Sequence, residues 1–121
     1  MCNKLHGNFK HIKKTGFGYK LFSYNYNPKA RIHHYRPMFP DGKESFKSEE
    51  VNKWDPKIDR RRGDGFCFFL TKRGAEKYQK NYSFFRERTI RKIKYSKGLG
   101  KCRHGMGTYS LCKEFKILEE F

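Results

Sequence analysis

Aromatic side chains supply most of the large apolar groups of this 121-residue chain, and this restricts the kind of core that it can build. The sequence contains 12 Phe, 8 Tyr and 1 Trp, against six Leu, six Ile and one Val. Each aromatic ring buries about 150–250 Å² when it enters a core. One domain typically organises about 100–200 residues. We therefore expect residues 1–121 to fold as a single domain around an aromatic core.

Positive charge is the second constraint. Lys and Arg number 29 against 12 Asp and Glu, which gives a formal net charge of +17. Residues 1–40 carry eight basic groups and no acid, residues 71–104 carry twelve basic groups and two acids, and the segment between them is neutral. Self-repulsion at this charge destabilises a compact chain, so a polyanionic partner is expected. The alternative is codon bias in an AT-rich genome, which inflates Lys without any selection for binding.

The composition also argues against several classes of protein. No apolar run approaches the roughly 18–20 residues that span a bilayer, so no membrane partner is expected. No apolar stretch follows the basic residues 1–14, which argues against a secretory signal. The four Cys residues are spaced too irregularly for a disulfide framework. Reduced thiols and a cytoplasmic location are therefore expected.

Local patterns in the first third of the chain predict two strands. Gly16 and Gly18 predict a turn that precedes a strand over residues 19–24. Asn and Pro at 25–28 predict the turn that closes this strand, because both residue types favour turns. Residues 30–36 are expected to pair back as a second strand.

The middle of the chain predicts a short helix, a buried strand and the main helix. Residues 45–54 contain a helix start signal, and the Asp-Pro pair at 55–56 is expected to end that helix. Residues 66–70 are apolar on both faces, as in a central strand covered on both sides. Thr71 is the expected N-cap of an amphipathic helix at about residues 72–83, whose outer face is basic.

The last third predicts two further strands, over 88–96 and 109–117, joined by a glycine-rich basic connection over 98–107. In the last strand, alternate residues from Tyr109 to Ile117 are expected to share one face. The order β-β-(α)-β-α-β-β predicts an α+β domain with a mainly antiparallel sheet and one main helix. The predicted core consists of Phe66, Phe68, Leu70, Tyr78, Leu111, Phe115 and Ile117.

Basic side chains that flank glycines form the candidate binding site. Glycine lets backbone amides approach a phosphate closely, and Lys and Arg supply the opposite charge. A tyrosine within a basic block can stack on a base, although each single ring also has a plain role in the core. The predicted nucleic-acid-binding residues are Arg60, Arg61, Arg62, Lys92, Lys94, Lys97, Lys101, Arg103 and Tyr19.

Three other kinds of site receive less support. The glycines at 16–18 precede a strand, whereas phosphate loops and dinucleotide fingerprints open a helix after a strand. Cys67, Cys102, His104 and Cys112 lack the closely spaced ligand pairs of a zinc site, so no metal or cofactor is expected. The histidines at 33, 34 and 104 are the candidates for acid–base catalysis of RNA cleavage, but no spacing fixes a catalytic pair, and no catalytic residue is assigned.

The segment from Gly63 to Thr71, the helix after it and the run from Ile90 to Tyr95 resemble small uncharacterised proteins of phages and mobile elements. Basic single-domain chains of this size look like anti-defence factors, including anti-CRISPR proteins. This resemblance implies a non-enzymatic inhibitor that acts by tight binding in the cytoplasm of a bacterial host. It transfers no functional residue.

Two functions are consistent with the sequence. The first is a binding protein that occupies a nucleic acid or a nuclease–guide RNA complex, with an acidic protein groove as the alternative partner. The second is a small basic ribonuclease or toxin. Turnover of labelled RNA or DNA would support the second, and stoichiometric binding would support the first.

Overall fold

Seven strands and two helices make up the described part of the chain. The computed structural model describes residues 4–27, 32–37, 46–48, 50–59, 63–80, 89–104 and 107–118. The elements are β1 (Gly16–Asn27), β2 (Ile32–Pro37), β3 (Phe46–Lys47), β4 (Val51–Lys53), α1 (Pro56–Asp59), β5 (Phe66–Phe68), α2 (Lys72–Lys80), β6 (Thr89–His104) and β7 (Gly107–Ile117). The architecture is α+β with an antiparallel sheet, as the sequence predicts.

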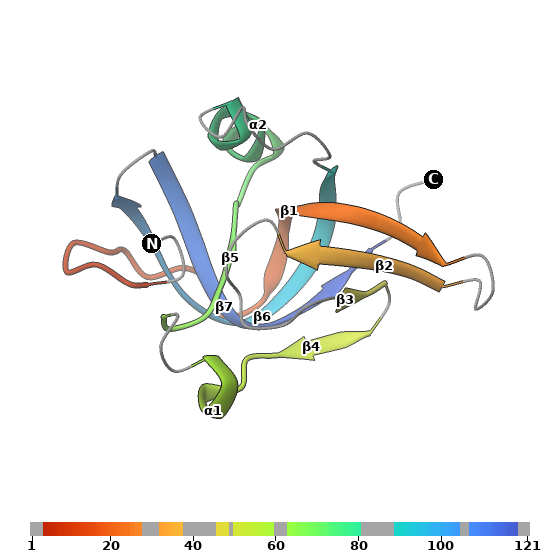
Figure 1. The fold of residues 1–121 in the computed structure, drawn as a ribbon. Coiled ribbons are helices and arrows are strands. Elements are labelled where there is room, and N and C mark those ends of the chain that lie inside the picture. Colours follow the sequence, from red (N-terminus) through yellow and green to blue (C-terminus); the bar gives the residue numbers. More distant parts are fainter. Residues whose placement is uncertain are drawn as a thin grey trace.

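The strands join in the order β3-β2-β1-β6-β7-β4, and β5 pairs with the remaining part of β7. Just after β5, Phe69 exchanges two backbone hydrogen bonds of 2.7 Å with Tyr19 of β1. Strands β1, β6, β7 and β5 therefore form a closed ring of backbone pairing. Figure 1 shows that the long strands β6 and β7 both bend sharply near their middle.

Strand β5 crosses the centre of the molecule and contributes to the core on both of its faces, which confirms the prediction of a strand covered on both sides. Phe66 and Phe68 are buried on one face, and Cys67 is buried on the other. We call the first face the aromatic cluster: Phe22, Phe46, Trp54, Phe66, Phe68, Ile93, Tyr95, Cys112, Phe115 and Ile117. The second is the helix-side cluster: Leu21, Cys67, Phe69, Ala75, Tyr78, Cys102, Tyr109 and Leu111.

Ring-on-ring contacts hold the aromatic cluster together. The rings of Phe66 and Phe115 are perpendicular, with centroids 4.9 Å apart. Trp54 meets Phe66 in the same edge-to-face manner at 5.0 Å. Such pairs stabilise a core by about 0.5–1.5 kcal/mol beyond the area that they bury. All predicted core residues are buried except Leu70, which packs against the cluster while partly exposed.

Helix α2 covers the helix-side cluster and begins as predicted. The N–H of Gly74 donates to Thr71 Oγ1 at 3.0 Å, which makes Thr71 the N-cap. Ala75 and Tyr78 are buried, whereas the Lys, Arg and Glu side chains of the helix are exposed. Residues 81–83 of the predicted helix lie outside the described residues.

The helix predicted over 45–54 is wrong, because this stretch forms β3 and β4 instead. Both strands place large rings in the aromatic cluster: Phe46 from β3 and Trp54 just after β4. The Trp54 N–H also donates to the Lys113 carbonyl of β7 at 2.7 Å. Burial of these rings and pairing with the sheet outweigh a helix signal that is only local.

The Asp-Pro pair at 55–56 begins a helix rather than ending one. Asp55 Oδ1 accepts a hydrogen bond of 2.9 Å from the Lys57 N–H, in the manner of an N-cap. Pro56 occupies the first helical position of α1, where its missing N–H costs nothing.

Strand β1 runs through both turns that the sequence predicts, at Gly16–Gly18 and from residue 25 to 27. The glycine at 18 serves close packing rather than a turn. A Cβ atom there would lie 2.7 Å from the Phe68 ring and 2.8 Å from the Phe69 carbonyl oxygen. The close contact of β1 with Phe68 and Phe69 thus requires glycine at position 18.

The expectation that alternate residues of 109–117 share one face is also wrong. Tyr109 and Leu111 belong to the helix-side cluster, whereas Phe115 and Ile117 belong to the aromatic cluster. The partner strand β6 is irregular opposite this change, with a left-handed residue at Lys97 (φ 52°) and a register shift between residues 98 and 100. The bend of the two strands directs their halves to different clusters.

Candidate nucleic-acid interface

Most of the predicted binding residues lie on one strand. Lys92, Lys94, Lys97, Lys101 and Arg103 all belong to β6, and Tyr19 lies on the neighbouring strand β1. The arginines at 60–62 lie outside the described residues. The glycine-rich connection predicted over 98–107 is wrong up to residue 104, because β6 continues through it.

Residues 4–15, here called the N-terminal segment, lie along this glycine-rich part of β6. The Lys10 and Lys101 backbones exchange hydrogen bonds of 2.8 and 2.7 Å. The Gly98 N–H donates to the Lys14 carbonyl at 2.9 Å. These amides are therefore engaged within the protein, and anion binding here depends on side chains rather than on backbone N–H groups.

Glycine is required where the N-terminal segment crosses β6. A Cβ atom at Gly98 would overlap the Lys13 carbonyl oxygen. At Gly100 it would lie 2.5 Å from the Phe9 ring and 3.0 Å from the Lys10 carbonyl oxygen. The absence of a side chain at these two glycines thus lets the N-terminal segment pack directly against the backbone of β6.

The far end of the N-terminal segment is also fixed. The Leu5 N–H donates to Asp64 Oδ2 at 2.8 Å, and the Tyr109 hydroxyl donates to the Lys4 carbonyl at 3.0 Å. Phe9 and Leu5 pack against the helix-side cluster. The basic block at the start of the sequence is therefore held beside the basic block of β6.

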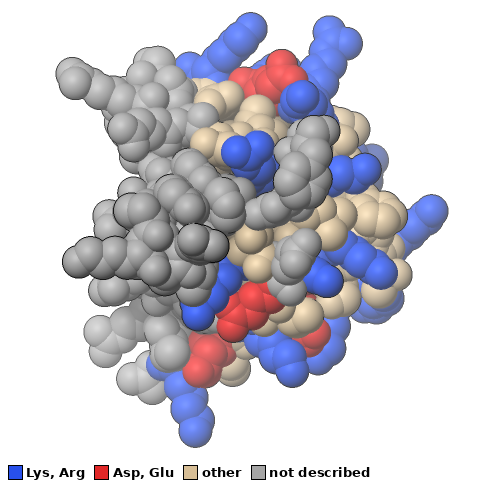
Figure 2. Space-filling view, turned by 90° about the vertical axis from the view of Figure 1, so that its right-hand side faces the viewer, with Lys and Arg blue, Asp and Glu red and all other residues tan. Residues whose placement is uncertain are grey.

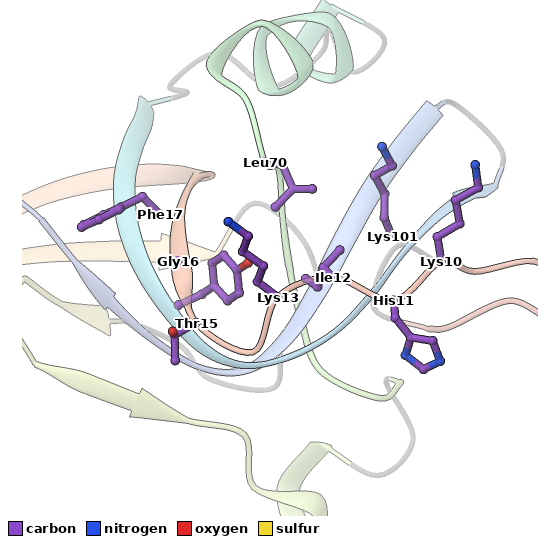
Figure 3. A pocket seen from close by; sticks show the side chains of 10 residues that line it. Lys10, His11, Ile12, Lys13, Thr15, Gly16, Phe17, Leu70 and Lys101 are labelled. Carbon is purple, nitrogen blue, oxygen red and sulfur yellow. The ribbon is translucent and has the colours of Figure 1, made fainter.

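A cavity of about 590 Å³ opens where the N-terminal segment meets β1 and β6. We call it the lysine pocket; its lining consists of Lys10, His11, Ile12, Lys13, Thr15, Gly16, Phe17, Leu70, Tyr95 and Lys101. Figure 3 shows the side chains of Lys10 and Lys101 running in the same direction from neighbouring segments, whereas His11 points the opposite way. Lys13 extends between Phe17 and Ile12 toward Leu70.

The pocket combines cations with an apolar lining. Lys10, Lys13 and Lys101 are all exposed, and none of the described residues that line the pocket is Asp or Glu. Burial raises the pKa of the Tyr95 hydroxyl above its ordinary value, and the nearby Cys112 raises it further. This hydroxyl therefore stays neutral at physiological pH and keeps its proton for donation.

Outside the pocket, Lys92 and Lys94 of β6 share a sheet face with two aromatic rings. Cross-strand partners project from the same face, and these pairs are Tyr19 with Lys92 and Phe17 with Lys94. Phe17 is 56% exposed, and Lys92 Nζ lies 5.1 Å from the centroid of its ring. Because Phe17 also lines the pocket, it connects the pocket with this face.

Lys94 is also the cross-strand partner of Lys116 on β7. Lys10 and Lys101 are paired in the same way. In each of these two pairs, one lysine of β6 therefore lies directly opposite a second lysine. Like charges in this position are destabilising. In a view of one side of the molecule, Lys and Arg side chains project from much of the described surface, and Asp and Glu occur in a few separate groups (Figure 2).

Lys97 differs from the other lysines of β6, because it has an acidic partner. Its Nζ lies 2.9 Å from Glu114 Oε2. The hydrogen bond from Lys97 and the positive charges of Lys97 and Lys53 lower the pKa of Glu114 below its ordinary value, against the opposing effect of burial. Lys97 therefore offers less positive potential to a ligand than Lys92 or Lys101.

Sequence reasoning did not select Lys10, Lys13 or Phe17. The signal for the two lysines was present as the excess of positive charge in residues 1–40, but only the fold shows which of these lysines approach β6. Phe17 lies between two glycines that predict a turn, but all three residues belong to strand β1.

The residues of the alternative sites do not come together in the described part of the chain. Cys67, Cys102 and Cys112 are buried thiols, and no three described His, Cys, Asp or Glu side chains gather as a metal site requires. His33 and His34 lie on β2, and His104 ends β6, but the side chains of all three lie outside the described part.

Among the described residues, no helix is both long and apolar enough to cross a membrane. In comparisons with protein-family models, curated proteins and solved structures, this chain finds no match.

Proposed function

We propose that this chain is a non-enzymatic binding protein for nucleic acid, either free or within a ribonucleoprotein. The observation that carries the proposal is the lysine pocket, where Lys10, Lys13 and Lys101, from two distant parts of the sequence, line one cavity and no described lining residue is Asp or Glu. A phosphate backbone supplies the closely spaced negative charges that such a surface attracts.

The placement of the lysines supports the proposal more strongly than their number does. A codon bias raises the count of Lys but does not place lysines opposite one another. The pairs Lys10–Lys101 and Lys94–Lys116 each lie on directly paired segments of the backbone, where like charges are destabilising. A bound polyanion would relieve this repulsion, and the unbound chain carries it as a cost.

The resemblance to phage anti-defence proteins adds a biological role to this proposal. In the cytosol of a bacterial host, a protein that occupies guide RNA or target nucleic acid would inhibit an anti-phage nuclease by tight binding. Incubation with labelled RNA and DNA separates this role from that of a ribonuclease. We expect stoichiometric binding without cleavage, and multiple turnover would move the ribonuclease function to first place.

A salt series tests whether the lysine pocket carries the binding. If Lys10, Lys13 and Lys101 contact phosphates, replacing all three by Gln should flatten the plot of log affinity against log salt by about two units, since each contact to a single strand contributes about 0.7. The matched control replaces Lys47, Lys57 and Lys77, three exposed lysines on β3, α1 and α2, with the same loss of charge.

The control variant should retain most of the salt dependence. Equal flattening in both variants would show that only net charge matters. A flat salt profile for the wild type would overturn the proposal. Salt-dependent binding to an acidic protein, without competition from free RNA or DNA, would replace nucleic acid by the acidic partner.

A further inference from the structure

We infer that the lysine pocket takes one unstacked nucleobase of a single-stranded nucleic acid, with the adjoining phosphates on Lys10, Lys13 and Lys101. This inference rests on the proposed function and specifies its ligand. It makes the protein selective for single strands over duplexes, because the bases of a duplex are stacked and paired.

The lining of the pocket provides the first argument. Three ammonium groups alone would suit any polyanion, but apolar side chains of Ile12 and Leu70 and the rings of Phe17 and Tyr95 line the same cavity. A sugar-phosphate backbone gains nothing from apolar walls. A base does, since it has an apolar face for stacking and an edge for hydrogen bonds.

The size of the pocket is consistent with a nucleotide unit. Its volume of about 590 Å³ lies within the range of about 300–1,000 Å³ that is typical of small-molecule sites. The neutral hydroxyl of Tyr95, a residue that lines the cavity, can donate to the carbonyl oxygens or ring nitrogens of a base.

Phe17 provides the second argument. Phe17 lines the pocket and is 56% exposed, so its ring is accessible to a base. Lys92 Nζ lies 5.1 Å from its ring centroid, and Lys94 is its cross-strand partner. A base stacked on this ring would have Lys92 and Lys94 nearby, in addition to the lysines of the pocket, to attract the neighbouring phosphates.

The test combines one substitution with one change in the ligand. The affinity of wild type and Phe17→Ala is measured for an oligouridine and for an abasic oligomer with the same number of phosphates. We expect Phe17→Ala to weaken oligouridine binding by about 5-fold to 150-fold, the range that loss of one base–aromatic stack produces. It should leave abasic-oligomer binding and duplex binding unchanged, because the lysines remain.

Val51→Ala is the matched control. Val51 is 53% exposed on β4, beside Lys116, and it does not line the pocket. This variant should bind the oligouridine like the wild type. A substitution at Phe17 is not expected to unfold the protein, since most of its side chain lies outside the core.

The outcomes separate the inference from the proposed function. If the wild type binds with salt dependence but Phe17→Ala weakens the oligouridine and the abasic oligomer equally, the pocket does not take a base and only the inference fails. Polyglutamate that binds as tightly as oligouridine would also overturn it. If the wild type binds none of the nucleic acids, the proposed function fails, and the inference fails with it.

Discussion

At the scale of single residues, the same residue type has three different roles in this protein. Lys20 is completely buried, and its Nζ donates to the Cys67 carbonyl at 2.8 Å while lying 5.7 Å from the Phe22 ring centroid. Lys97 is exposed but forms an ion pair with Glu114. Lys101 is exposed at the pocket. A count of positive charge therefore overstates the charge available for binding.

The ion pair of Lys97 gives a pH-dependent prediction. Because the pKa of Glu114 is lowered in the folded protein, the pair contributes stability above the ordinary pKa of 4.5, and this contribution is lost as the pH falls through the lowered value. In Lys97→Gln, the pKa of Glu114 measured by NMR should rise. The difference in unfolding free energy between this variant and the wild type should shrink at acid pH.

Lys94→Gln serves as the control for that measurement, because it removes a charge from the same strand and leaves the pair of Lys97 and Glu114 intact. An unchanged Glu114 pKa in Lys97→Gln would show that the ion pair does not persist in solution.

At the scale of elements, the sequence predicts strands and helices correctly where neighbouring residues alone determine the structure. The buried strand at β5 and the N-cap and buried stripe of α2 are confirmed, because both follow from neighbouring residues alone. The errors arise at glycines and at residues 45–54. There the structure depends on distant partners, such as Phe68 against Gly18 and Lys113 against Trp54, which no local pattern reveals.

The close packing of the N-terminal segment against Gly98 of β6 leads to a second prediction. In Gly98→Ala, the added Cβ would overlap the Lys13 carbonyl oxygen, so the segment must shift, and such overpacking typically costs about 1–3 kcal/mol. Hydrogen exchange of the Lys10 and Lys101 amides should accelerate, because both pair across this contact. Affinity for nucleic acid should fall as Lys10 and Lys13 move away from Lys101.

Gly7→Ala is the control for this variant. Gly7 lies on the same segment, and a Cβ atom there meets nothing within 4 Å. It should leave exchange and affinity unchanged. Equal exchange rates of the Lys10 and Lys101 amides in Gly98→Ala and the wild type would show that the segment does not pack against β6 in solution.

At the scale of the whole molecule, the charge pattern of the sequence predicts that two basic blocks exist but not which of their residues meet. The fold joins them by laying the N-terminal segment along β6, and this brings Lys10 and Lys13 to Lys101. The predicted residues Lys92, Lys94, Lys101 and Tyr19 lie on or beside this surface. The sequence does not predict Phe17, Lys10 and Lys13 as site residues, because only the tertiary pairing of distant segments brings them to this surface.

The central claim is that Lys10 and Lys101, which lie opposite each other, together bind an anionic ligand, and that their mutual repulsion lowers the stability of the unbound protein. Lys10→Glu tests it most directly, because it converts the repulsive cross-strand pair into an attractive one. The control is Lys77→Glu on the exposed face of α2, which changes the net charge equally. Thermal unfolding and nucleic-acid affinity are measured for both variants and the wild type.

We predict that Lys10→Glu is more stable than the wild type by about 0.2–1 kcal/mol. We also predict that it binds nucleic acid much more weakly than Lys77→Glu does. Lys10→Glu that binds as well as Lys77→Glu would contradict the claim that this lysine pair forms the binding site.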